Sequence, residues 1–182
     1  MKQLLLLVDI QNDYFPGGAM ELVGSPAAGS NAERLLLAFR RKGLPIVHIQ
    51  HISTRTSATF FLPNTIGAEL HSCVKPTAGE VVFQKNFPNS FRGTPLLEHL
   101  RALNATQLVI AGMMTHMCID TTTRAAVDLG FECVLASDAC ATRSLSLGDV
   151  SVSAENVQAA FLAALNGSFA TVIPVEGICA SL

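Results

Sequence analysis

The sequence predicts an α/β fold in which helices cover both faces of a parallel β-sheet. Short apolar runs alternate along the chain with longer segments of helical periodicity. The runs are continuous rather than alternating, which is typical of strands buried on both faces. At 182 residues the length suits one domain, and we expect a single domain over residues 1–182.

The first half of the chain contains three predicted strands, at residues 4–10, 45–50 and 80–85. Ser25-Pro26 and Thr94-Pro95 each combine an N-cap residue with a proline at N1. These pairs predict a helix after the first strand, ending at Gly43, and a shorter helix after the third. Residues 52–79 show no clean period, so we expect a functional loop there, either a lid or an oligomer contact.

The second half continues the alternation, with strands predicted at residues 108–111, 132–136 and 170–173. Gly112 breaks the first of these runs. A helix is predicted from Cys118 to the C-cap glycine Gly130, and another from Ser153 to Gly167. Residues 141–152 are polar and predicted to form a loop.

Composition narrows the classes of function. Hydrophobic residues make up 49% of the chain and charged residues 14%, which favours burial against copies of itself and hence a homo-oligomer. The net charge of −2 and the lack of a long basic run argue against nucleic-acid binding. No apolar span suits a membrane helix. The apolar run at residues 4–8 is too short for a signal peptide. Five cysteines without a C-x-x-C pair suggest a reduced, cytoplasmic protein.

Three chemically active side chains lie at or just beyond predicted strand ends: Asp9, Lys85 and Cys118. In parallel sheets, ligands bind beyond the carboxyl ends of the strands. Each residue also has an ordinary reading: a turn-capping acid, an exposed lysine or a small buried thiol. Together they favour catalysis. A thiolate attacks a carbonyl carbon, a lysine stabilises the negative charge, and a carboxylate transfers the proton.

The charge state of Cys118 follows from its predicted place in the first turn of a helix. A helix N-terminus favours a thiolate, and so does the ammonium of Lys85. Asp9 opposes both. We expect the first two effects to win and to lower the pKa of the thiol below its usual value of about 8.5.

The segments DIQNDYF, QKNFPNSFRGTPL and GMMTHMCIDTTTRAAVDLGF resemble those of the isochorismatase-like cysteine hydrolases, a superfamily that includes nicotinamidases and N-carbamoyl amide hydrolases. The resemblance implies a three-layer α/β/α sandwich with a six-stranded parallel sheet, assembled as dimers or tetramers. It also implies that Asp9 is the general base, Lys85 the thiolate partner and Cys118 the nucleophile. A cis peptide at Met113–Met114 would aim the N–H groups of Met114 and Cys118 at an oxyanion.

The predicted function is therefore hydrolysis of a C–N bond of amide type in a small molecule, through a thioester on the Asp-Lys-Cys triad and without a cofactor. One alternative is a metal-dependent deamidase of the nicotinamidase type. In such enzymes an Asp-x-His pair on the second strand binds the metal, but Ile49 stands where that aspartate would precede His51. His48 and His51 are also spaced to point to opposite faces of a strand. We therefore expect no metal site.

Another alternative is an oligomeric binding protein of the same fold whose site is idle; the intact triad argues against it. Isochorismatases proper do not rely on a cysteine at the position of Cys118, so its presence favours amide chemistry. Five residues are predicted either to line the substrate pocket or to pack in the core: Phe15, Phe60, Phe91, His116 and Met117.

Overall fold

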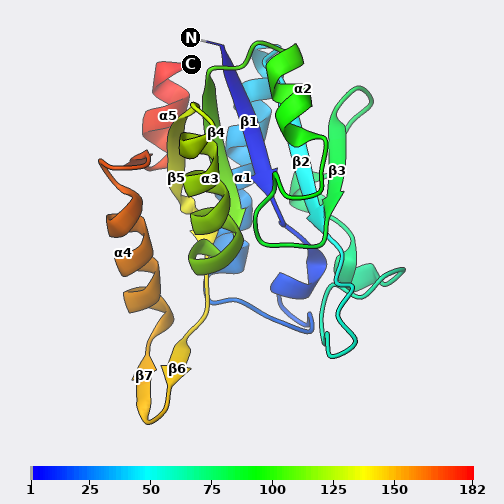
Figure 1. Cartoon of the computed structure of the whole chain (residues 1–182), viewed down its shortest axis with the longest axis vertical. Helices are drawn as coiled ribbons and strands as arrows, with labels where there is room; N and C mark the ends of the chain where they lie inside the picture. The colour runs from blue at the N-terminus through cyan, green and yellow to red at the C-terminus, as the bar shows by residue number, and fades with distance from the viewer. Residues whose placement is uncertain (1) are drawn as a thin grey trace.

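A computed structural model describes residues 2–182 (Figure 1). Its main feature is a six-stranded, fully parallel sheet with the strand order β3-β2-β1-β4-β5-β8. The strands are β1 Gln3–Val8, β2 Ile46–His51, β3 Val81–Lys85, β4 Gln107–Met113, β5 Glu132–Ala141 and β8 Thr171–Ile173. The predicted six-stranded parallel sheet is confirmed.

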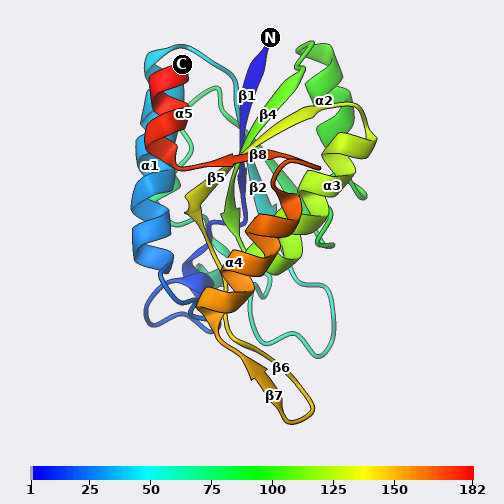
Figure 2. The same ribbon diagram turned by 90° about the vertical axis from the view of Figure 1, so that its left-hand side faces the viewer.

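Helices cover the two faces of the sheet, as Figure 2 shows edge-on. Helices α1 (Ser25–Arg41) and α5 (Val175–Ser181) lie on one face. Helices α2 (Leu96–Ala102), α3 (Asp120–Asp128) and α4 (Ala154–Leu165) lie on the other. No helix among residues 2–182 is long and apolar enough to cross a membrane.

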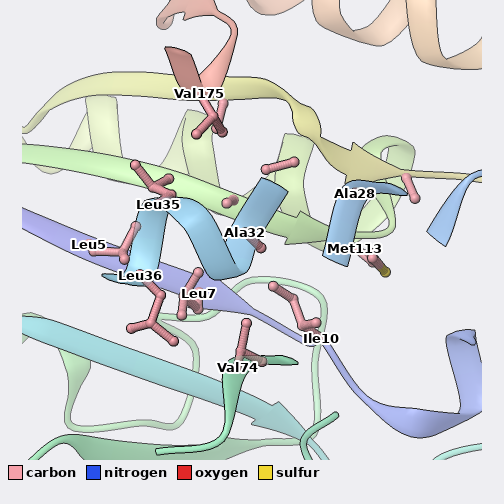
Figure 3. Packing of buried hydrophobic residues seen from close by; sticks show 14 of the residues in the cluster. Leu5, Leu7, Ile10, Ala28, Ala32, Leu35, Leu36, Val74, Met113 and Val175 are labelled. Carbon is pink, nitrogen blue, oxygen red and sulfur yellow. The ribbon is translucent and has the colours of Figure 1, made fainter. Parts of the chain in front are cut away.

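Two apolar clusters, one on each face of the sheet, form the core. The alternating side chains of β1 divide between them: Leu5 and Leu7 meet α1, while Leu6 points to the side of α2 and α3. Figure 3 shows Leu35 and Leu36 of α1 packed over Leu5 and Leu7. Burial of each such side chain contributes roughly 1.5–3 kcal/mol. The continuous apolar runs in the sequence therefore reflect a sheet covered on both sides.

The structure corrects the prediction for residues 141–152. Within this segment β6 (Leu145–Leu147) and β7 (Val150–Val152) pair as an antiparallel hairpin that extends away from the sandwich (Figures 1 and 2). Leucine or valine alternates with serine in both strands, and Gly148 in the turn has φ 56°. The sequence shows this period of two, but runs of only three residues with a central serine also resemble a loop.

The turn after β4 also differs from the prediction. Residues Thr115–Ile119 form one π-helical turn, η4, and α3 begins only at Asp120. Cys118 therefore lies in the π-helical turn rather than in the first turn of an α-helix. β5 and β4 are longer than predicted, and α5 was not predicted.

Gly112 does not end its strand but allows β4 to pass very close to β1. A Cβ atom at this position would lie 1.9 Å from the carbonyl oxygen of Val8, and Gly112 has φ 138°. The pairing of β4 with β5 shifts register between Ile110 and Gly112. This close approach brings the end of β4 next to Asp9, the residue that follows β1.

Candidate active site

The site lies at the carboxyl end of the sheet, where the strand order reverses. Strands β1, β2 and β3 run outward to one edge, and β4, β5 and β8 run to the other. Such a reversal leaves a crevice between the two central strands, here β1 and β4. Asp9 follows β1, Cys118 follows β4, and Lys85 is the last residue of β3. The fold thus brings together the three side chains that were predicted from strand ends.

Asp9 and Lys85 form a fully buried ion pair, with 2.8 Å between Lys85 Nζ and Asp9 Oδ2. The ammonium also donates to the carbonyl oxygens of Phe87 at 3.0 Å and Pro88 at 3.2 Å. It lies 3.4 Å from Nδ1 of His51. Burial lowers the pKa of Lys85, but Asp9 and Cys118 outweigh that effect, and the pKa is raised overall. Lys85 is therefore a fixed positive charge that holds Asp9 in place.

The backbone of Asp9 is unusual for a residue other than glycine, with φ 53°. Its N–H donates to the carbonyl oxygen of Ile49 on β2 at 3.0 Å. Immediately after the strand, the chain thus turns into the left-handed region while it stays tied to β2. Strained residues of this kind cluster at functional sites, where the surrounding structure holds them.

Cys118 is 5% exposed and lies beside the Asp9–Lys85 pair. Candidate ligand atoms of Asp9, His51 and Cys118 all lie within 4.8 Å of one another. Burial raises the pKa of the Cys118 thiol, Asp9 raises it further, and Lys85 only partly opposes these effects. The expectation of a lowered pKa was wrong, because the sequence did not reveal how deeply the thiol is buried. Burial and Asp9 therefore favour the thiol form of Cys118 over the thiolate.

A cavity of about 210 Å³ opens above Cys118. Its walls come from four parts of the chain: the turn after β1, the end of β2 with the loop that follows it, the turn after β3 and the turn after β4. The lining residues are Tyr14, His51, Ser53, Thr54, Arg55, Ser57, Ala58, Thr59, Phe60, Phe61, Asn86, Pro88, Met114, Met117 and Cys118. This volume suits a small molecule placed directly over the thiol.

Of the five predicted pocket residues, Phe60 and Met117 line this cavity and the other three do not. Phe15 packs in the core and stacks on His71 with ring centroids 3.6 Å apart. Phe91 stacks on Phe131 on the α2–α3 side of the sheet. His116 turns away toward Thr142, with 2.6 Å between Nδ1 and the hydroxyl oxygen. The sequence located these residues near the site but not the direction of their side chains.

The turn that carries Cys118 has the conformation that the resemblance implied. The Met113–Met114 peptide bond is cis. Met114 lines the cavity together with Cys118.

Comparison with protein families decides the classification. The family model described as the Isochorismatase domain matches residues 3–177. The chain belongs to the isochorismatase family. It is a hydrolase of that family, as the resemblance of its three segments implied.

Relatives of this isochorismatase-family hydrolase match most or nearly all of the chain. YddQ, an uncharacterized isochorismatase family protein of Bacillus subtilis (strain 168), is 49% identical over 97% of this chain and 98% of its own length. The crystal structure of a proposed isochorismatase hydrolase from Oleispira antarctica has a TM-score of 0.95 at 46% identity, covering 98% of this chain and 96% of the other. A streptothricin hydrolase of Streptomyces noursei is 36% identical over 77% of this chain and 50% of its own length.

The residues of this family member do not fit a metal site of the nicotinamidase type. Ile49, where an aspartate would be needed, is fully buried among apolar side chains. His48 points away from the site and bonds Glu80 at 2.8 Å. Asp9, His51 and Cys118 are grouped closely enough for a metal, but the Lys85 ammonium already neutralises Asp9 there.

Several residues of the isochorismatase-family site were missed from sequence. Tyr14 and Phe61 line the cavity, and each is next in sequence to a phenylalanine that was predicted as a pocket residue. His51 and Arg55 line the cavity as well. Lys85 was predicted because it is a polar residue at the end of a strand. The same criterion applies to His51, which ends β2 and pairs in register with Lys85. Arg55 gave no such signal because it lies in a loop without periodicity.

Proposed function

We propose that this protein hydrolyses a C–N bond of amide type in a small molecule, through a thioester on Cys118. The observation that carries the proposal is the Cys118 thiol beside the buried Asp9–Lys85 pair in the lining of a small cavity. Relatives named streptothricin hydrolase, nicotinamidase and ureidoacrylate amidohydrolase support a substrate of this class.

The first half of the reaction makes the thioester. Asp9 takes the proton of Cys118 as the sulfur attacks the carbonyl carbon of the substrate. A C–S bond forms, and the electron pair of the carbonyl π bond moves to its oxygen. When this pair returns, the C–N bond breaks and the leaving nitrogen takes the proton from Asp9. The amine or ammonia departs, and the acyl group stays on Cys118.

The second half restores the enzyme. Asp9, again a carboxylate, takes a proton from water as the water oxygen attacks the thioester carbon. The C–S bond then breaks, the acid leaves, and the proton returns to the sulfur. A thiol that is neutral at rest suits this cycle, because Asp9 must start each half as a base.

Lys85 and the turn after β4 have supporting roles in this proposal. Lys85 fixes the orientation of Asp9 and stabilises negative charge as it develops on Cys118. The backbone N–H groups of Met114 and Cys118 would donate to the oxyanion of the tetrahedral intermediate. We also propose a reducing, cytoplasmic setting, because all five cysteines are free.

The test is turnover of a panel of small primary and N-carbamoyl amides by wild type and two matched variants. Cys118→Ala removes the nucleophile with little change in packing and should abolish release of ammonia. Cys133→Ala makes the same change at another buried thiol outside the cavity and should retain activity. Hydrolysis by Cys118→Ala at the wild-type rate would refute the mechanism. Loss of wild-type activity on chelation, restored by zinc or iron, would favour the metal-dependent alternative.

A further inference from the structure

The cavity above Cys118 contains one feature that amide hydrolysis does not require, the guanidinium of Arg55. Arg55 lines the cavity and is exposed at the surface. Among residues 2–182, the ion pairs join Arg40 and His48 to Glu80, Lys85 to Asp9, and Arg124 to Asp120. None of these pairs includes Arg55, so its charge is available to a ligand.

The other charges around the cavity cancel. Asp9 and Lys85 neutralise each other at 2.8 Å, and burial and Asp9 raise the pKa of Cys118, which favours its neutral thiol form. Burial lowers the pKa of His51, and the charges of Lys85 and Arg55 lower it further against the opposing effect of Asp9. No aspartate or glutamate belongs to the lining residues. Arg55 therefore leaves the cavity with a net positive charge at neutral pH.

Apolar and polar groups both line the cavity. Tyr14, Phe61 and Met114 offer mainly apolar surface. The loop that carries Arg55 adds the hydroxyl groups of Ser53, Thr54, Ser57 and Thr59. A ligand that contacts both Cys118 and Arg55 would place its amide at the thiol and a hydrogen-bond acceptor at the guanidinium.

We propose that Arg55 selects amide substrates that carry a carboxylate in addition to the scissile amide. This inference rests on the proposed function. A guanidinium pairs with a planar carboxylate through two parallel hydrogen bonds, and neighbouring hydroxyls can satisfy the remaining lone pairs. A phosphate is a poorer match, because phosphate sites commonly use glycine-rich backbone N–H groups and no glycine lines this cavity.

The charge preference can be measured without any hydrolysis. Iodoacetate and iodoacetamide alkylate cysteine in the same way and differ in charge, so the ratio of their rates at Cys118 reports the field at the thiol. The ratio is followed by mass spectrometry of the Cys118 peptide. Arg55→Gln should lower the iodoacetate-to-iodoacetamide ratio by about three- to five-fold, and Arg55→Lys should restore much of it. High salt should reduce the difference between wild type and Arg55→Gln.

The matched control is Arg101→Gln, which removes the same charge from an exposed position on α2 outside the cavity. It should leave the ratio at the wild-type value. An alkylation ratio that is the same in wild type and Arg55→Gln would overturn the inference. So would an equal fall of the ratio in Arg101→Gln, because it would show only an effect of net charge.

Turnover supplies the second readout. Succinamate carries a carboxylate beyond its amide, and levulinamide carries a neutral methyl ketone in that place. Wild type should prefer succinamate in kcat/KM, and Arg55→Gln should lower the ratio of kcat/KM for succinamate to kcat/KM for levulinamide by about five-fold. Equal hydrolysis of both amides would overturn the inference and leave the proposed function intact. Failure of the proposed function would look different: no amide in the panel would be hydrolysed, whatever the alkylation ratio.

Discussion

Asp9 has opposite effects on the nucleophile before and during the proposed reaction. Its negative charge raises the pKa of Cys118 in the resting site. The same carboxylate then accepts the proton that the thiol loses. A single substitution can separate these two effects, because only the second requires a base.

Asp9→Asn should therefore shift the alkylation profile of Cys118 to lower pH while turnover falls by about 10²–10⁴-fold. The sign follows from the charge: without the carboxylate, the thiolate is less disfavoured and Lys85 is free to stabilise it. The profile is measured with iodoacetamide across pH, and turnover with any amide that the wild type hydrolyses. An alkylation profile that stays in place, together with wild-type turnover, would exclude Asp9 as the base.

At the scale of single residues, the sequence predicted that the three catalytic candidates lie together, but it did not predict the burial and contacts of the side chains. The positions of Asp9, Lys85 and Cys118 at strand ends were sufficient, because parallel strands end at the same edge of a sheet. The pKa of Cys118 was predicted in the wrong direction, because burial depends on how the whole turn packs. Phe15 and His116 are close to the site in sequence, yet their side chains point into other contacts.

At the scale of elements, the loop after β2 forms a wall of the cavity and is not itself part of the sheet. Asp13, in the short 3₁₀ helix after β1, is the buried anchor of this loop. Its Oδ2 accepts from the backbone N–H of Phe61 at 2.6 Å, and its Oδ1 accepts from that of Ala19 at 3.2 Å. Phe61 has φ 54°, which is strained for a bulky residue. Asp13 thus stabilises a cavity wall in an unfavourable conformation.

Asp13→Asn should lower the free energy of unfolding by about 1–3 kcal/mol and raise KM more than it lowers kcat. The amide has one acceptor oxygen for two N–H groups, so one buried donor loses its partner. Urea denaturation and steady-state kinetics measure the two effects. Asp128→Asn, an exposed change on α3, is the matched control and should stay within about 0.5 kcal/mol of wild type. Equal stability of the two variants would show that Asp13 does not anchor the loop.

Elements with a long apolar stripe or run were predicted well from the sequence, and short ones were not. Helix α1 and strand β1 bury enough apolar surface that pattern alone identifies them. The β6–β7 hairpin is short and polar at every second position, which resembles a loop. The π-helical turn η4 follows the close approach of β4 to β1, a tertiary contact that no local pattern encodes.

At the scale of the whole molecule, Glu80, the residue before β3, bonds side chains of α1 and β2 away from the site. Arg40 of α1 holds its carboxylate through two hydrogen bonds, at 2.7 and 2.9 Å, and His48 of β2 adds a third at 2.8 Å. The Arg40 guanidinium lowers the pKa of Glu80 to about 2 against the opposing effect of burial. A carboxyl group with a lowered pKa stabilises the folded state above its unfolded pKa, near 4.5.

Glu80→Gln should therefore be less stable than wild type at neutral pH, and the difference in Tm should shrink as pH falls from about 4.5 to about 2. Thermal unfolding followed by circular dichroism across this range measures it. Glu69→Gln, which removes a carboxylate at an exposed position away from Arg40, is the matched control. A gap between wild type and Glu80→Gln that stays constant with pH would mean that the Arg40 contact does not shift the titration of Glu80.

We also propose a homo-oligomer, a dimer or tetramer, on the basis of the apolar composition. The structure adds exposed apolar side chains on the projecting hairpin, with Leu147 86% and Val150 64% accessible. Light scattering at micromolar concentration should give a mass above the 19.3 kDa of one chain. A monomer under these conditions would contradict the proposal.

The central claim is that an acyl group passes through Cys118, and mass spectrometry of acid-quenched protein during turnover tests it most directly. The predicted result is a mass increase equal to the substrate without its amine, mapped to the Cys118 peptide and absent in Cys118→Ala. In Asp9→Asn the thioester should be hydrolysed slowly because the base is absent. The adduct should therefore accumulate in this variant. Turnover by the wild type with Cys118 unmodified throughout, together with unchanged hydrolysis by Cys118→Ala, would contradict the claim.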